Sequence, residues 1–98
     1  MLKIRLSRSA RQDLKEIWLY SATHWGEDKA DSYMLEMDVK IKSLAASPGL
    51  GKKRFEIKQG YFSAQINRHL VFYFLTKNHL NILRILHEKM DVKLHLYP

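Results

Sequence analysis

Two amphipathic helical patterns, separated by little more than one glycine, constrain this sequence more than any other feature. In the first pattern, apolar or small residues recur three and four positions apart: Ala10, Leu14, Ile17, Trp18, Ser21 and Trp25. Such spacing is typical of a helix with one buried face. Ser7 or Ser9 can cap the start of this helix, and Gly26 can end it.

The second pattern begins almost at once. Its predicted buried stripe, with Tyr33 alongside, comprises Ala30, Met34, Met37, Ile41 and Leu44. The run SPGLG, residues 47–51, ends this helix. Because the connection is so short, the two helices are expected to pack antiparallel as a hairpin. The two stripes must then be buried against the rest of the chain.

Strand patterns flank the hairpin. Residues 2–6 alternate between apolar and basic side chains, which predicts a short half-buried strand. After the hairpin, residues 52–57 could form a strand, and residues 62–67 alternate as a strand buried on one face. The run LVFYFL, residues 70–75, is apolar throughout, as in a strand buried on both faces. A turn, TKNH, in which Asn78 can take a positive φ, leads to the last strand, LNILRIL.

Short loops between the later strands predict an antiparallel meander. The expected fold is therefore α+β, with the order β-α-α-β-β-β. The N-terminal strand and the helical hairpin are expected to pack on one face of a small antiparallel sheet. Contacts between hairpin and sheet are expected from Leu14, Trp18, Ile41 and Leu44. A length of 98 residues predicts one domain, residues 1–98.

Charge and cysteine content narrow the function classes. The net charge of +7 and the pI of about 9.8 favour an acidic protein or nucleic acid as partner. The absence of cysteine excludes disulfides, thiol catalysis and Cys-based zinc sites. The histidines are scattered without a metal-binding motif, so no metal or cofactor is expected. With no signal peptide and no apolar span of about 20 residues, we expect a cytoplasmic protein without membrane association.

Several segments, taken together and in order, resemble the RelE/ParE toxin superfamily, and its ParE branch most closely. They are SARQDLKEIWLY, WGEDKADSY, LAASPGLGKKR, INRHLVFYF and ILRILHEKMD. The resemblance implies a bacterial toxin of a type II toxin–antitoxin system, of the kind associated with plasmid stabilisation. A ParE-like toxin inhibits DNA gyrase by binding it and is neutralised by a ParD-like antitoxin. Two alternatives remain. One is a RelE-like, ribosome-dependent, metal-free mRNA endoribonuclease, and the other is a non-toxic regulatory protein that binds an antitoxin.

Metal-free RNA cleavage needs a general base, a general acid and positive charge at the phosphate. Candidates for these roles are Arg68, His69, Arg84, His87, Glu88 and Tyr97, and a nuclease would use Arg68, Arg84 and His87 first. In a regular strand, Arg84 and His87 point to opposite faces, and only a bulge or the strand end could bring them to one phosphate. We therefore expect no catalytic site. Instead, Arg84 pairs with a carboxylate, Glu56 or Asp91, and His87 is a hydrogen-bonded residue at the strand end.

Exposed basic and apolar residues predict two binding surfaces. Target contact is expected from basic residues outside the core: Lys52, Lys53, Arg54, Arg68, Lys89 and Lys93. These attract acidic protein surface and, secondarily, the phosphates of DNA held by gyrase, although a basic run such as 52–54 can also be a merely solvated loop. A small acidic antitoxin is expected on a free sheet edge and on the outer face of the hairpin, because Leu19 and Tyr20 fall outside the buried stripe. The residues assigned to this second surface are Leu19, Tyr20, Trp25 and Tyr33.

Overall fold

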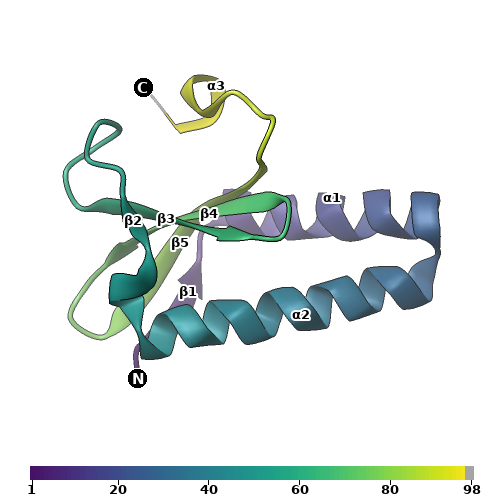
Figure 1. Cartoon of the computed structure of the whole chain (residues 1–98), viewed down its shortest axis with the longest axis horizontal. Coiled ribbons are helices and arrows are strands. Elements are labelled where there is room, and N and C mark those ends of the chain that lie inside the picture. The colour runs from purple at the N-terminus through teal and green to yellow at the C-terminus, as the bar shows by residue number, and fades with distance from the viewer. Residues whose placement is uncertain (97–98) are drawn as a thin grey trace.

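A five-stranded sheet, covered on one face by a helical hairpin, forms the framework of the molecule (Figure 1). The structure is a computed structural model that describes residues 1–96. Its elements, in chain order, are β1 (Lys3–Leu6), α1 (Arg8–Trp25), α2 (Glu27–Ala46), the 3₁₀ helix η1 (Pro48–Leu50), β2 (Lys52–Lys53), β3 (Tyr61–Ile66), β4 (His69–Leu75), β5 (His79–His87) and α3 (Val92–Leu96). The predicted α+β class is confirmed.

The hairpin begins and turns where the sequence predicts. Ser7 caps α1, since its hydroxyl oxygen accepts the N–H of Ala10 at 2.9 Å. Gly26 alone separates the two helices, with φ 94° and ψ 160°, a backbone conformation that is essentially restricted to glycine. Its N–H donates to the carbonyl of Ala22 at 2.9 Å, and Ser47 follows the last residue of α2.

The sheet has the order β1-β5-β4-β3-β2, and β3, β4 and β5 form the predicted antiparallel meander. β1, however, pairs with β5 in parallel, with Lys3 opposite His79. The prediction of a wholly antiparallel sheet with the N-terminal strand packed on its face is therefore wrong. The N-terminal strand is an edge strand of a mixed sheet, because its pairing satisfies backbone groups of β5 that would otherwise face solvent. Beyond β1, the N–H of Ser7 continues this contact by donating to the carbonyl of Ile82 at 3.0 Å.

The main core lies between the hairpin and the sheet. Met37, Ile41 and Leu44 of α2 pack in one cluster with side chains of all the long strands: Ile66, Val71, Tyr73, Leu80, Ile82 and Ile85. Val71, Phe72 and Tyr73 are all fully buried, which confirms the prediction for the centre of LVFYFL, whereas Leu70, Phe74 and Leu75 are only partly buried. Figure 1 shows α3 on the face opposite the hairpin.

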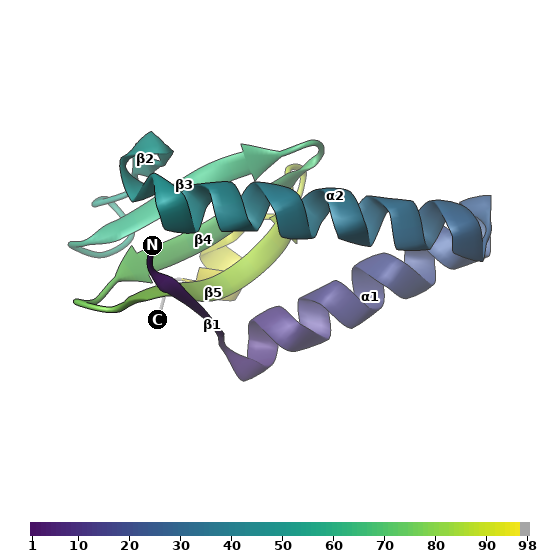
Figure 2. The same ribbon diagram turned by 90° about the horizontal axis from the view of Figure 1, so that it is seen from below.

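Near its turn, the hairpin runs past the sheet, as both ribbon views show (Figures 1 and 2). The predicted burial is consequently wrong for two residues there. Trp18 is only half-buried, and its indole N–H donates to Asp31 of α2 at 2.8 Å instead of packing on the sheet. Trp25, predicted in the buried stripe, is exposed. Leu14 packs against the core from its margin, and Ile41 and Leu44 are buried as predicted.

Three local features differ from the sequence predictions. β2 covers only residues 52–53, because a turn closed by the Arg54 N–H and the Tyr61 carbonyl (2.8 Å) replaces the rest of the expected strand. The positive φ occurs at Asn67 (54°), in the two-residue turn between β3 and β4, and not at Asn78. The short helix α3 was not predicted. Among the described residues, no helix has the length and apolar content required to cross a bilayer.

Candidate functional site

Arg84 forms a two-point ion pair with Asp13 of α1. Its Nε and Nη2 each donate to a carboxylate oxygen at 2.8 Å, and the backbone N–H of Ile85 donates to the same carboxylate at 2.9 Å. Only 6% of Asp13 is exposed, so these three donors satisfy a charge that has been removed from water. The prediction that Arg84 pairs with a carboxylate is confirmed, but the proposed partners, Glu56 and Asp91, are wrong.

The position of α1 explains this pairing. β1 ends at Leu6, opposite Ile82, so that α1 and not a strand lies along the next part of the β5 edge. There the Asp13 carboxylate accepts the backbone N–H of Ile85, which a neighbouring strand would otherwise bind. The hydrogen bonds that Arg84 donates to Asp13 raise the pKa of Arg84 above its ordinary value, despite the opposing effect of burial. The Arg84 guanidinium is thus engaged by Asp13, and only 21% of the Arg84 side chain is exposed.

Two histidines lie side by side where β4 begins and β5 ends. His69 and His87 pair across the two strands, with their rings edge to face and their centroids 5.4 Å apart. His87 accepts the backbone N–H of Lys89 at Nδ1 (3.2 Å), which confirms the predicted strand-end hydrogen bond. The Nδ1 of His69 lies 2.7 Å from the hydroxyl of Tyr33 on α2. Burial, followed by the charge of His87, lowers the pKa of His69, while burial raises the pKa of Tyr33, so both groups are held in their neutral forms.

The strand register keeps Arg84 and His87 apart. From Phe72 opposite Arg84 to His69 opposite His87 the pairing is continuous, and residues three apart in such a stretch point to opposite faces. A register shift does occur in β5, but it falls at Leu83, before Arg84, and does not bring the two side chains together.

Arg68 is largely exposed in the β3–β4 turn, with its Nη1 3.3 Å from Glu88. Glu88 also accepts the side-chain amide of Gln65 at 2.8 Å. Tyr97 lies outside the described residues. Within residues 1–96, no group of three histidine, aspartate or glutamate side chains is placed to hold a metal ion. The predicted nuclease residues thus do not converge: Arg68 lies in the β3–β4 turn, and Arg84 and His87 point to opposite faces of β5.

The basic run at residues 52–54 divides into two parts. Lys52 and Lys53 are exposed on β2. Arg54 is largely buried: it donates to Glu56 at 2.7 Å and to Ser63 at 3.3 Å, and its guanidinium lies 5.2 Å from the centre of the Phe72 ring. Because these contacts support the sheet, Arg54 is a structural contact as well as a predicted target residue.

The other predicted target residues lie elsewhere. Arg68 and Lys89 are adjacent to one another in the fold, since the N–H of Glu88 donates to the carbonyl of Arg68 at 2.8 Å. Lys93 is exposed on α3. The six predicted residues consequently form separate groups: one on β2, one around the β3–β4 turn and one on α3.

Apolar side chains are exposed on both helices of the hairpin. Leu19, Tyr20 and Trp25 are 61%, 57% and 58% exposed, and the Tyr20 ring contacts the rings of both His24 and Trp25. Tyr33, assigned to the same surface from the sequence, is half-buried against the core. Two further exposed residues of α2, Leu35 and Val39, were missed, although their spacing of four in a polar stretch is a readable signal.

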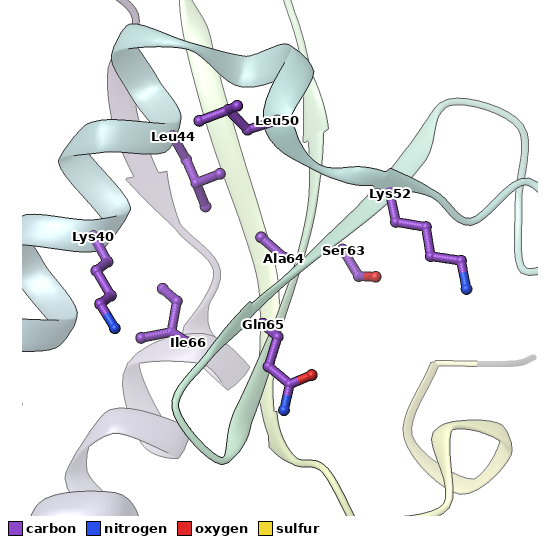
Figure 3. Close-up of a pocket in the computed structure, with 8 residues that line it drawn as sticks. All are labelled: Lys40, Leu44, Leu50, Lys52, Ser63, Ala64, Gln65 and Ile66. Atoms are coloured by element: carbon purple, nitrogen blue, oxygen red, sulfur yellow. The ribbon is translucent and has the colours of Figure 1, made fainter.

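β3 has an open edge. β2 pairs only with Phe62 and Ser63, and beyond them an open hollow of about 340 Å³ lies between β3 and the C-terminal half of α2 (Figure 3). Its lining residues are Lys40, Leu44, Leu50, Lys52, Ser63, Ala64, Gln65 and Ile66. In Figure 3, Leu44 and Ile66 lie on the α2 side of β3, whereas Lys52 and Gln65 point to the other side. A strand edge of this kind can accept an added strand from a partner.

Residues 4–92 match the family described as the ParE toxin of the type II toxin-antitoxin system, parDE. The match includes the whole hairpin and every strand of the sheet, apart from the first residue of β1, Lys3. This chain belongs to the ParE toxin family. It is accordingly a ParE-type toxin of a type II toxin–antitoxin system.

Curated relatives agree with the ParE assignment over almost the full chain. Toxin ParE1 of Caulobacter vibrioides is 36% identical over 96 residues, which is 98% of this chain and 99% of the relative. Toxin ParE1 of Mycobacterium tuberculosis is 36% identical over 88 residues, covering 89% of this chain and 90% of the relative.

Solved structures support the ParE fold at lower identity. A structure titled as the chromosomal ParDE toxin–antitoxin system from P. aeruginosa superimposes with a TM-score of 0.76 at 20% identity, covering 89% of this chain and 96% of that one. The YoeB dimer from Staphylococcus aureus gives a TM-score of 0.63 at 22% identity, covering 88% and 95%. At these identities the similarity shows a shared fold, which is that of RelE/ParE toxins.

Proposed function

We propose that this ParE-family toxin inhibits DNA gyrase by binding it in the cytoplasm, without cleaving RNA, and that a ParD-like antitoxin neutralises it. The observation that carries the proposal is the ion pair between Arg84 and the buried Asp13. A nuclease would need that guanidinium beside His87, and the two side chains point to opposite faces of β5. Binding, in contrast, needs no such convergence.

The proposal is tested by expressing the toxin in bacteria. We expect DNA breaks and an SOS response with intact messages. His87→Ala should keep its toxicity, because His87 makes only strand-end and ring contacts. Cleavage of messages by the wild type, lost in a folded His87→Ala protein, would favour the RelE-like nuclease instead. A folded wild type that is not toxic at all would favour the purely regulatory alternative.

Gyrase contact is proposed for Lys52 and Lys53, with Arg68, Lys89 and Lys93 as further contacts. The two lysines are exposed and form no ion pair with the described residues, so they can meet phosphates or acidic protein surface. The test is supercoiling inhibition in vitro by the double variant Lys52→Ala/Lys53→Ala, which should be several-fold weaker with an unchanged melting curve. Lys77→Ala, in the β4–β5 turn, is the matched control. Undiminished inhibition by the double variant would move the search to Arg68, Lys89 and Lys93.

Arg54, also predicted to contact gyrase, has contacts within the fold as well. Its removal would break contacts with Glu56, Ser63 and Phe72, so a loss of inhibition in an Arg54→Ala protein could follow from a damaged sheet. Arg54→Lys keeps the charge but loses the planar two-donor geometry. Comparing the inhibition and the melting temperature of the lysine and alanine variants separates gyrase contact from support of the fold.

Antitoxin binding is proposed at Leu19, Tyr20 and Trp25 and at the open edge of β3. Large exposed apolar side chains and an unpaired strand edge are the features that a helix and a strand of a partner would cover. Leu19→Ala and Tyr20→Ala should each weaken binding of the cognate antitoxin about tenfold, in line with truncation of a central apolar contact. Equal binding by both variants and by the exposed control Thr23→Ala would place the antitoxin elsewhere. Tyr33, tied to His69, is expected to affect stability more than binding.

A further inference from the structure

The charges of the chain are strongly segregated. Residues 16–38, which form the turn end of the hairpin, contain six acidic residues and one basic residue, a net charge of −5. The rest of the chain contains 16 basic and four acidic residues, a net charge of +12. The overall value of +7 therefore hides an acidic hairpin end and a strongly basic remainder. This hairpin end projects beyond the sheet (Figure 2).

Four of the five large apolar residues exposed on the hairpin lie within this acidic part, namely Leu19, Tyr20, Trp25 and Leu35, and Val39 directly follows it. On α1, Glu16 is three and four residues before Leu19 and Tyr20, so its carboxylate borders the same side of the helix. On α2, Asp31 and Asp38 are four residues before and three residues after Leu35. Each apolar stripe thus has carboxylates along its border, together with Lys15 on α1 and with Lys42, which pairs with Asp38 at 2.8 Å, on α2.

Distance keeps the acidic end electrostatically distinct. The molecule is 38 Å long, whereas the Debye length at physiological ionic strength is about 8 Å. The basic remainder is consequently screened from most of the hairpin end. A segment that docks there experiences the local carboxylates and not the net charge of the protein.

We infer that the antitoxin segment covering the hairpin is an amphipathic helix whose apolar stripe is bordered by basic residues. This inference rests on the proposed antitoxin function and gives that partner a charge polarity. Acidic residues of the antitoxin then contact the basic remainder, where Lys52 borders the open edge of β3. A basic-bordered helix replaces the acidic segment that the sequence led us to expect on the hairpin. Acidic residues there would face the carboxylates of the toxin, and like charges beside an apolar contact that loses water oppose docking.

The test uses the full-length toxin and two synthetic helical peptides with the same leucine stripe. One peptide carries lysines along the borders of the stripe and the other carries glutamates. Binding is measured by calorimetry at low and high sodium chloride. We expect the lysine peptide to bind at least about tenfold tighter at low salt, with the preference shrinking at high salt. The net charge of the toxin alone predicts the reverse order, so the two explanations are separated.

Toxin variants locate the binding site. Tyr20→Ala should weaken the binding of the lysine peptide. The double variant Glu16→Gln/Asp38→Asn should reduce the preference of the toxin for the lysine peptide over the glutamate peptide. Glu56→Gln, an exposed acid in the basic remainder, should leave the preference unchanged. Tighter or equal binding of the glutamate peptide, no binding of either peptide, or indifference to Tyr20→Ala would overturn the inference. Because neither gyrase nor the natural antitoxin is present, such a result leaves the supercoiling and antitoxin-binding tests to be decided separately.

Discussion

Asp13 is the residue that holds the Arg84 guanidinium in place. Removing its carboxylate leaves the Arg84 guanidinium and the N–H of Ile85 without their acceptor. Breaking a buried ion pair by deleting one partner costs about 3–5 kcal/mol. We expect Asp13→Ala to lower the free energy of unfolding by about that amount in urea denaturation. Loss of toxicity in this variant should follow the loss of folded protein.

Two controls define the Asp13 result. Glu16→Ala changes an exposed acid on the same helix and should alter the free energy of unfolding by less than about 0.5 kcal/mol. The double variant Asp13→Ala/Arg84→Ala should cost less than the sum of the two single changes, because the residues share one interaction. If Asp13→Ala were as stable as Glu16→Ala, the ion pair would have no structural role.

His69 makes the stability depend on pH. Burial is the main cause of its lowered pKa, so the folded protein resists protonation of this ring. The unfolded chain takes up the proton near the ordinary pKa of about 6.5, and the folded chain does so only at lower pH. Stability should therefore fall as the pH drops below about 6.5. Urea midpoints at pH values of about 7.5 and 5.5 should fall more for the wild type than for His69→Gln, and equal falls would contradict the assignment.

The sequence predicted part of this residue-scale picture. Arg84 in an apolar strand needs a carboxylate, and that requirement is visible in the sequence. The identity of the partner is not visible in the sequence, because Asp13 is 71 residues away. Asp13 also lies near Lys15 and Glu16, a charged stretch that is typical of the exposed face of a helix. Only the packing of α1 along the edge of β5 brings the two together.

Gly26 sets the geometry of the hairpin at the level of the elements. A Cβ at this position would meet no atom within 4 Å, so the cost of a substitution comes from the backbone alone. Its φ and ψ belong to a region that costs other residues about 1–3 kcal/mol. We expect Gly26→Ala to lower the free energy of unfolding by about that amount, measured by chemical denaturation.

Gly49 is the matched control for Gly26. It also has open space around its Cα, but its φ is not positive. Gly49→Ala should therefore change stability little. A similar loss in both variants would show that the turn tolerates other conformations and that the glycine is not needed for it.

Elements with a clear period were predicted well, and elements defined by pairing were not. The helices and the meander follow from spacings of three to four and of two, which are local properties. The parallel partner of β1 is 76 residues away, as in the pair Lys3 and His79, and no local pattern identifies it. Likewise, Lys52 and Lys53 form β2 only because Phe62 and Ser63 lie opposite them.

At the scale of the whole molecule, β1 completes the sheet by covering the edge of β5. β1 supplies the parallel partner of β5, whereas α3 contains no buried residue. A chain without residues 1–6 should lose its cooperative thermal transition, because one edge of β5 and the adjoining core are left uncovered. A chain that ends at Asp91 should keep a cooperative transition at a somewhat lower temperature. Cooperative melting of the first variant, observed by circular dichroism, would show that β1 is dispensable.

The pairing of β1 with β5 also bears on how the toxin is made. A ribosome delivers β1 and Asp13 first and His79 to His87 almost last, so the early strand and its acid have no partners during most of translation. The nascent chain therefore cannot complete its core until β5 (His79–His87), in the final fifth of the chain, has been synthesised. A premature stop codon before β5 yields a fragment without a closed sheet. The sheet can thus close only when nearly the whole chain has been made.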